Sequence, residues 1–160
     1  MKFATSDLCD AFPGQVRVAE PIFSEFGGVS RFAGEIETLR VFEDNALVAE
    51  TLGTPGRGRV LVVDGGGSRR SALVGGRLAK LARSNGWTGV VVNGCVRDSA
   101  ELRKIPVGVR ALATSPLRSG KQGKGERGGA LSFAGLTFSP GQYLYADEDG
   151  IVVADQSLTG

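Results

Sequence analysis

The sequence has no histidine and only two cysteines among its 160 residues. The missing histidine excludes the Ser-His and Cys-His nucleophile systems and removes the commonest general base. Cys9 and Cys95 stand far apart and form no CxxC pair, so a disulfide framework and a four-cysteine zinc site are both excluded. A metal ion would have to be held by oxygen ligands, which favours Mg²⁺ or Mn²⁺.

Long apolar runs and a strong charge of one sign are also missing. No run approaches the roughly 20 apolar residues needed to span a bilayer. The first residues, MKFATSDLCDAF, contain no long apolar stretch, so we expect no signal peptide, no membrane association and a cytoplasmic protein. The formal net charge is +2. That charge is too small to predict direct nucleic-acid binding by bulk electrostatics.

The composition that remains is that of one globular unit. Hydrophobic residues make up 41% of the chain and charged residues 22%. Together with the length, these values predict a single domain over residues 1–160. Hydrophobic patterning predicts helices over residues 5–11, 44–52, 71–85 and 98–104. It predicts strands over residues 31–42, 59–64, 87–93, 107–113, 130–133, 136–138, 143–146 and 151–154.

The order of these elements indicates an α/β fold with a mixed sheet. Strands and helices alternate in the middle of the chain, which favours parallel pairing there. The last third is rich in turns and short strands, which favours antiparallel pairing. Thr5 or Ser6 is expected to cap the first helix, and Asp44 the second.

A glycine run, Gly65-Gly66-Gly67, follows the predicted strand 59–64. It does not match the dinucleotide-binding pattern GxGxxG, because Arg70 stands at the third glycine position. A Walker A loop is excluded too, since Arg118 replaces the glycine five positions before Gly123. We therefore expect the run to form a tight turn with positive φ angles.

The segment Arg97-Asp98 is the most informative one for chemistry. It comes shortly after the buried strand 87–93, and binding sites of α/β proteins gather beyond the carboxyl ends of strands. Asp98 and Glu101 allow two interpretations. They could form an N-cap and capping box for the helix 98–104. Alternatively, Asp98 could hold a hydrated divalent ion beside Arg97, which would bind an anionic substrate.

With these residues in view, the chain resembles the family of the regulator of ribonuclease activity A and the related 4-hydroxy-4-methyl-2-oxoglutarate aldolases. The family's metal-enzyme signature is matched by Gly76, Arg97, Asp98 and Glu101. Many of its aldolases carry aspartate where this chain has Gly76. The resemblance spans almost the whole chain through the segments TSDLCDAF (5–12), FGG (26–28), FEDNALV (42–48), GRGRVLVVDGGGS (56–68), NGWTGVVVNGCVRD (85–98) and LYADEDGIVV (144–153).

The resemblance implies a swivelling β/β/α fold, assembled as a homotrimer or as a hexamer built from two trimers. It also implies a site in which Asp98 is the direct ligand of Mg²⁺ or Mn²⁺ and Arg97 binds a small 2-oxo acid. The substrate carboxylate would be bound by the backbone amides of Gly75, Gly76, Arg77 and Leu78. Free amides at a helix start suit an anion.

The function implied is that of a divalent-metal-dependent lyase, which cleaves the C3–C4 bond of 2-oxo acids to give pyruvate. The substrate would be 4-hydroxy-4-methyl-2-oxoglutarate, oxaloacetate or both. Aldol cleavage needs a base for the 4-hydroxyl proton, and Glu101 is the nearest carboxylate in the sequence. Decarboxylation needs only an electron sink and is the less demanding reaction.

Two other functions stay open. The chain could be a non-catalytic regulator that binds a ribonuclease. The basic loop 117–127, with Arg118, Lys121, Lys124 and Arg127, could attract RNA or an acidic partner, although a solvated loop is the simpler interpretation. A quinone methyltransferase is disfavoured by the failed glycine pattern.

Overall fold

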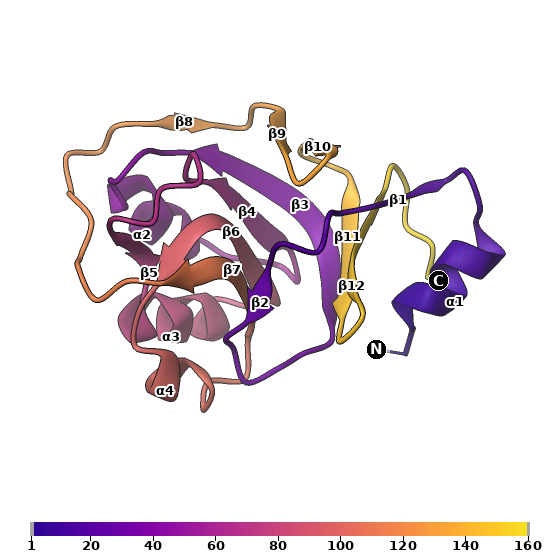
Figure 1. Ribbon diagram of the computed structural model, residues 1–160, viewed down its shortest axis with the longest axis horizontal. Coiled ribbons are helices and arrows are strands. Elements are labelled where there is room, and N and C mark those ends of the chain that lie inside the picture. Colours follow the sequence, from indigo (N-terminus) through magenta and orange to yellow (C-terminus); the bar gives the residue numbers. More distant parts are fainter. Residues whose placement is uncertain (1, 160) are drawn as a thin grey trace.

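A mixed sheet dominates the computed structural model, which describes residues 2–159 (Figure 1). The helices are α1 (Thr5–Ala11), α2 (Ala46–Leu52), α3 (Gly76–Ser84) and α4 (Ser99–Leu102). The strands are β1 (Val16–Val18), β2 (Ser24–Glu25), β3 (Phe32–Arg40), β4 (Val60–Asp64), β5 (Ala72–Val74), β6 (Gly89–Val96), β7 (Gly108–Thr114), β8 (Glu126–Arg127), β9 (Leu131–Phe133), β10 (Leu136–Phe138), β11 (Tyr143–Asp147) and β12 (Gly150–Ala154).

The main sheet has the order β1-β12-β11-β3-β4-β6-β7-β2, with β5 paired to β6 and β8 to β3. β3, β4, β6 and β7 are mutually parallel, while β1, β2, β11 and β12 join antiparallel. The long β3 connects the two regions, because its first half pairs with β11 and its second half with β4 (Figure 1). The predicted α/β class, the mixed sheet and the parallel pairing in the middle of the chain are confirmed.

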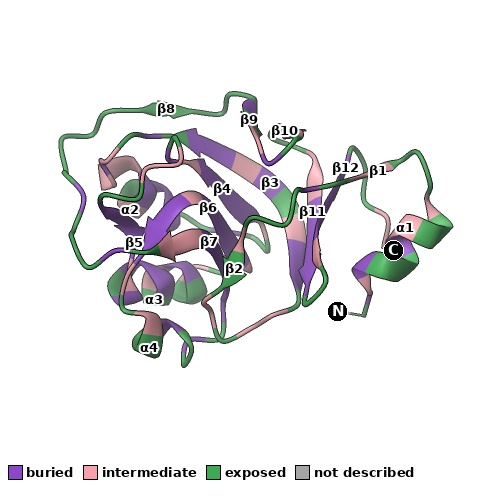
Figure 2. Ribbon diagram, in the orientation of Figure 1, coloured by how far each residue is buried: buried purple, intermediate pink, exposed green. Residues whose placement is uncertain are grey.

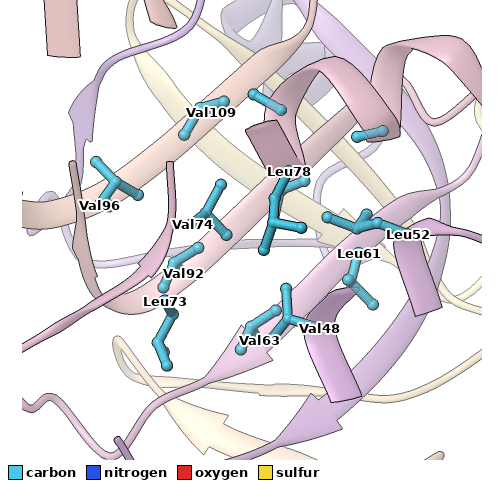
Figure 3. Close-up of a cluster of buried hydrophobic side chains, with 14 of the residues drawn as sticks. Val48, Leu52, Leu61, Val63, Leu73, Val74, Leu78, Val92, Val96 and Val109 are labelled. Carbon is cyan, nitrogen blue, oxygen red and sulfur yellow. The ribbon is translucent and has the colours of Figure 1, made fainter. Parts of the chain in front are cut away.

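Alternating side chains give the sheet two buried faces (Figure 2). In β4, Leu61 and Val63 pack in the cluster under α2 and α3, which is drawn in Figure 3. Their neighbours Val60 and Val62 join a second cluster on the opposite face, with side chains from β9 to β12. Both faces of β4 are covered, which explains why the sequence there is a continuous apolar run.

Two predicted boundaries in the middle of the chain were wrong. Leu73, Leu78 and Leu81 have helical spacing, but residues 72–74 form β5 and the helix begins only at Gly76. Tertiary pairing of β5 with the end of β6 overrides that periodicity. β6 also continues to Val96, three residues beyond the predicted end of this strand at residue 93.

The first helix is capped from a distant part of the chain. Neither Thr5 nor Ser6 caps it with its own side-chain oxygen; the cap position is Ala4, which makes no side-chain bond. Instead, the Asp147 carboxylate accepts hydrogen bonds of 2.7 Å from both the backbone N–H and the hydroxyl of Thr5. Asp147 is buried at the end of β11, so this contact fastens α1 to the sheet.

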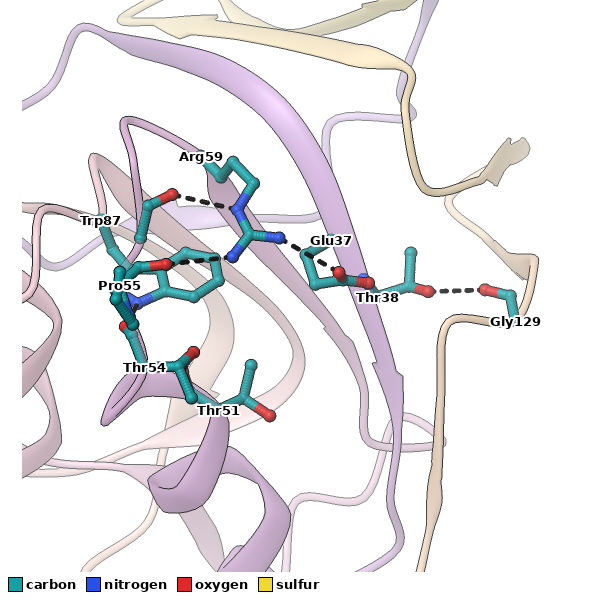
Figure 4. Close-up of polar contacts among 9 residues, drawn as sticks. Glu37, Thr38, Thr51, Thr54, Pro55, Arg59, Trp87 and Gly129 are labelled. Atoms are coloured by element: carbon teal, nitrogen blue, oxygen red, sulfur yellow. Dashed lines mark hydrogen bonds and ion pairs between the residues drawn. The ribbon is translucent and has the colours of Figure 1, made fainter.

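A polar network supports the start of β4 on the helical side of the sheet (Figure 4). The Arg59 guanidinium lies 4.8 Å from the centre of the Trp87 ring and donates hydrogen bonds to the carbonyls of Pro55 and Gly56. It also pairs with Glu37 at 3.2 Å. The network fixes the bend before β4, and Trp87 is buried.

We predict that Asp147→Asn lowers the free energy of unfolding at pH 7 by about 1–3 kcal/mol, the usual cost of losing hydrogen bonds to a charged group. Burial raises the pKa of Asp147, but the hydrogen bonds from Thr5 and Asp149 outweigh it and hold the pKa below its ordinary value. Because the pKa of Asp147 is lower in the folded protein, its ionised carboxylate contributes fully to stability above the unfolded-state pKa of about 3.9. This contribution is lost as the pH falls through the folded-state pKa.

Urea unfolding of both proteins at several pH values measures this difference. The difference in free energy of unfolding between the two proteins should be largest at neutral pH and should decrease in acid. The exposed Asp149 of the same hairpin is the control, and Asp149→Asn should change stability little at any pH. A difference that is independent of pH would contradict the assigned role of the Asp147 charge.

Candidate active site

Arg97 and Asp98 follow β6 directly, at the carboxyl ends of the parallel strands. Asp98 has φ 60° and ψ 41°, the left-handed conformation that residues other than glycine seldom adopt. Such a conformation costs about 1–3 kcal/mol and is concentrated at functional sites. The turn directs the Asp98 side chain back toward the start of α3 rather than along α4.

The Asp98 carboxylate binds the start of α3. Its Oδ2 accepts a 2.8 Å hydrogen bond from the Gly76 backbone N–H, whereas its side chain makes no cap hydrogen bond to α4. Asp98 does occupy the N-cap position of α4, but without a side-chain cap bond the capping-box interpretation of Asp98 and Glu101 is wrong. This bond connects the end of β6 to the N-terminus of α3, where backbone amides and the helix dipole favour negative charge.

A small cavity of about 70 Å³ lies beside this bond. Arg97, Asp98, Gly75, Arg77 and Leu78 contribute to its lining, so the fold brings most of the predicted site residues together. The Arg97 guanidinium is held by a long hydrogen bond of 3.4 Å to the Pro116 carbonyl. The cavity is lined in full by Asn45, Ala72, Gly75, Arg77, Leu78, Arg97, Asp98, Arg118 and Lys121.

The four predicted amides of Gly75 to Leu78 are not equivalent. The Gly76 amide is committed to Asp98, and Gly76 is not among the residues that line the cavity. Arg77 and Leu78 occupy the first turn of α3, whose amides have no acceptor within a helix. Ala79 is the first residue of the helix whose amide has a backbone acceptor, the Gly75 carbonyl. The amides left without an acceptor at the start of α3 are therefore those of the first turn beyond Gly76.

Glu101 lies at the edge of the site rather than in its lining. Its carboxylate forms a 2.7 Å ion pair with Lys80 on α3, and its side chain is 44% exposed. It also fills the space in which a side chain at position 76 would lie, because a Cβ on Gly76 would overlap its carboxylate oxygens. An aspartate at position 76 would require Glu101 to move.

Sequence reasoning missed four residues of the lining: Ala72 of β5 and three residues with polar side chains. Asn45 comes from the start of α2, where its side-chain amide donates to the Leu73 carbonyl. Arg118 and Lys121 come from the basic loop that was interpreted as solvated surface. The available signal was the concentration of positive charge in that loop, but only the fold shows that the loop reaches the Arg97-Asp98 turn.

The glycine run after β4 forms the expected tight turn, with φ 66° at Gly66 and 73° at Gly67. Its amides already have acceptors within the protein. Gly66 donates to the Asp64 carboxylate, and Gly65 and Gly67 donate to the Asn93 carbonyl. A loop with its amides used in this way is not a phosphate cradle.

The donor set restricts how a metal could be held. Within residues 2–159, no group of three or more Cys, Asp or Glu side chains is placed to share an ion. Asp98 is the single carboxylate in the cavity lining. Mg²⁺ often binds one or two carboxylates and keeps several waters, so a site with one protein ligand fits this ion.

The sequence model of the RraA-like family, described as Aldolase/RraA, matches residues 5–153. The chain belongs to the RraA-like family. An RraA-like protein from Laribacter hongkongensis, named "Putative 4-hydroxy-4-methyl-2-oxoglutarate aldolase", is 58% identical over 99% of both chains. A relative from Dechloromonas aromatica bears the same name and is 54% identical, covering 99% of this chain and all of its own.

Two solved RraA-like structures share the fold, each with a TM-score of 0.96. One is described as the RNA-processing inhibitor RraA from Thermus thermophilis and is 50% identical, covering 100% of this chain and 97% of its own. The other is described as an S-adenosylmethionine:2-dimethylmenaquinone methyltransferase from Geobacillus kaustophilus and is 51% identical, covering 98% of this chain and 97% of its own. These likenesses confirm the family and the fold expected from the sequence.

We predict that Gly75→Ala displaces the Asp98 carboxylate. Gly75 has φ −131°, which alanine accepts, but its Cβ would lie 2.6 Å from Asp98 Oδ2. Moving the carboxylate breaks its bond to the Gly76 amide and should lower the free energy of unfolding by about 1–3 kcal/mol. Chemical denaturation of the single and double variants measures this effect.

The matched background is Asp98→Ala, in which the overlap no longer exists. There, Gly75→Ala should cost clearly less, giving a coupling energy of about 1 kcal/mol or more between two touching residues. Strictly additive effects would contradict the described contact between Asp98 and the start of α3.

Proposed function

We propose that the protein is a divalent-metal-dependent lyase that cleaves the C3–C4 bond of 2-oxo acids to give pyruvate. The observation that carries the proposal is the strained Asp98 turn, which presents a carboxylate and the Arg97 guanidinium to one cavity at the α3 N-terminus. The names of the L. hongkongensis and D. aromatica relatives support the aldolase reaction. Oxaloacetate decarboxylation is the second reaction that we assign to this site.

The residues of the chain have separate tasks in this proposal. The first-turn amides of Arg77 and Leu78 bind the carboxylate next to the keto group, because they are directed out of the helix end and need an acceptor. Arg97, oriented by the Pro116 carbonyl, adds positive charge where the keto oxygen becomes an enolate oxygen. The Gly76 amide holds Asp98 in place through Oδ2, which leaves the Oδ1 side of the carboxylate for an ion.

Asp98 would be the protein ligand of Mg²⁺ or Mn²⁺. When bound there, the ion supplies a Lewis acid for the developing enolate. During cleavage of 4-hydroxy-4-methyl-2-oxoglutarate, the C3–C4 electron pair moves into the new C2–C3 double bond while the 4-hydroxyl proton leaves to a base. Glu101 stays our proposal for that base, although it must reach past Gly76 to serve. Oxaloacetate loses CO₂ by the same electron movement and needs no base.

We predict that Asp98→Asn reduces kcat/KM for pyruvate release by about 10² or more with both substrates, which is the typical loss when one transition-state contact is removed. EDTA should abolish the wild-type activity and Mg²⁺ should restore it. The measurement is a steady-state assay with 4-hydroxy-4-methyl-2-oxoglutarate and with oxaloacetate, combined with calorimetric titration of Mn²⁺ in the absence of substrate.

Asp10→Asn is the matched control, since Asp10 is an exposed aspartate on α1, and Figure 1 shows α1 on the opposite side of the molecule from α3 and α4. It should keep both activity and Mn²⁺ binding. Full metal-dependent activity in Asp98→Asn, or an activity that is unaffected by EDTA, would overturn the proposed function.

A second candidate function, regulation of a ribonuclease, is favoured by the description of the T. thermophilis structure as an RNA-processing inhibitor. We predict that such regulation would act by surface contact and would survive both EDTA and Asp98→Asn. Co-purification with ribonuclease complexes and an RNA cleavage assay measure it. A protein that neither binds such a complex nor changes the rate of RNA cleavage is no regulator of this kind.

Assembly into a trimer or a dimer of trimers also stays a proposal. Val18, Phe42 and Leu117 are large apolar side chains that are more than half exposed, which supports contact between copies.

No helix within residues 2–159 is sufficiently long and apolar to cross a membrane. The methyltransferase description belongs to the G. kaustophilus protein, and the occupied amides of the Gly65–Gly67 turn do not favour that activity here.

A further inference from the structure

The basic loop between β7 and β8 is fastened to the rest of the fold. Figure 1 shows it passing β5 and α2 before it reaches β8. Ala72 of β5 donates to the Leu117 carbonyl at 2.8 Å, and the Ser119 hydroxyl donates to the Ala72 carbonyl at 2.7 Å. These bonds lie on both sides of Arg118. The loop is therefore attached to the strand that leads into α3.

Lys121 is fixed in the same way by the segment before α2. Gly120 exchanges hydrogen bonds with the backbone of residues 43–45, and the Asp44 carboxylate accepts the amides of Gln122 at 2.8 Å and Gly123 at 3.2 Å. Asp44 is buried, which by itself raises the pKa of its carboxyl, but these amides and that of Ala46 hold the pKa below its usual value. A permanent carboxylate thus anchors the backbone next to Lys121.

The charge in the cavity is strongly unbalanced. Four of its lining residues carry a positive charge, and Asp98 carries the single negative one. None of the four takes part in the ion pairs formed within residues 2–159. The four cationic residues are Arg77, Arg97, Arg118 and Lys121. A divalent ion would increase this excess, so the site favours a substrate with more than one negative charge.

We propose that Arg118 and Lys121 bind the second carboxylate of a dicarboxylic 2-oxo acid and thereby exclude monocarboxylic ones. This inference rests on the proposed function, in which Arg97 and the α3 amides bind the 2-oxo acid end. The two cations come from a separate, anchored loop and line the same cavity as the start of α3. Ionic hydrogen bonds of this kind correspond to a preference of about 10- to 100-fold for the dicarboxylate.

The two reactions assigned to the site use this carboxylate differently. In the cleavage of 4-hydroxy-4-methyl-2-oxoglutarate, the C5 carboxylate keeps its charge and leaves on the second pyruvate. In oxaloacetate decarboxylation, the C4 carboxylate itself becomes neutral CO₂, and its bond electrons pass to the enolate, which is then protonated at C3. An ion pair with Lys121 therefore stabilises bound oxaloacetate more than its transition state.

Removing the Lys121 charge should change KM and kcat in different ways for the two substrates. Lys121→Met should raise KM about tenfold or more for both substrates. With 4-hydroxy-4-methyl-2-oxoglutarate, kcat should be little changed, because Lys121 contacts the C5 carboxylate equally in the bound substrate and in the transition state. With oxaloacetate, kcat should rise, because a contact of the ground state has been removed. A merely structural role of Lys121 would not produce this difference between substrates.

The direct test is calorimetric binding of two five-carbon probes in the presence of Mg²⁺. One is 2-oxoglutarate, which lacks the 4-hydroxyl group and cannot undergo the retro-aldol reaction. The other is 2-oxovalerate, which has a methyl group in place of the second carboxylate. The wild-type protein should prefer 2-oxoglutarate by about tenfold or more. Lys121→Met and Arg118→Gln should each lose most of that preference.

Lys124→Met is the matched control, because Lys124 is an exposed lysine of the same loop that lines a different cavity. It should keep the wild-type preference. Equal binding of both probes by the wild-type protein, or an unchanged preference in both variants, would overturn this inference while leaving the lyase activity intact. Failure of both probes to bind, together with the absence of pyruvate release, would instead overturn the proposed function and this inference with it.

Discussion

The hydrogen bond between the Asp98 carboxylate and the Gly76 amide is the contact on which the site depends. It joins the turn after β6 to the first turn of α3, so the turn that carries Arg97 and the helix with free amides line the same cavity. The backbone at Asp98 is left-handed where it makes this bond, a conformation that costs about 1–3 kcal/mol and that the surrounding contacts must offset. Gly75 and Gly76 belong to the same arrangement, because a side chain at either position would occupy the space of Asp98 or Glu101.

The architecture around this contact explains why a small chain can build a charged cavity. β4, β6 and β7 are parallel and buried, and their carboxyl ends meet at one edge of the sheet. The buried core under α2 and α3 supports this edge, while three connections supply the charged and polar groups of the cavity. These are the Arg97-Asp98 turn, the start of α3 and the anchored loop that carries Arg118 and Lys121.

Local sequence patterns predicted the elements well where the structure depends on local chemistry. The runs at 59–64 and 107–113, and the Arg97-Asp98 pair after a strand, were sufficient for the parallel core and for placing this turn at the carboxyl ends of its strands. Contacts between distant residues were not predictable in the same way. Asp147 caps a helix 142 positions away, and Asp44 binds an amide 78 positions along the chain. For this reason the basic loop looked like a solvated segment, although its backbone is anchored next to both cations of the cavity.

The most direct test of the central claim is the anomalous-scattering map of a crystal grown with Mn²⁺ and 2-oxoglutarate. We predict a manganese peak within coordination distance of Asp98, with the 2-oxo acid end against Arg97 and the α3 N-terminus. A peak that lies elsewhere on the protein, or an Asp98 carboxylate turned away from the cavity with no ion beside it, would contradict the account.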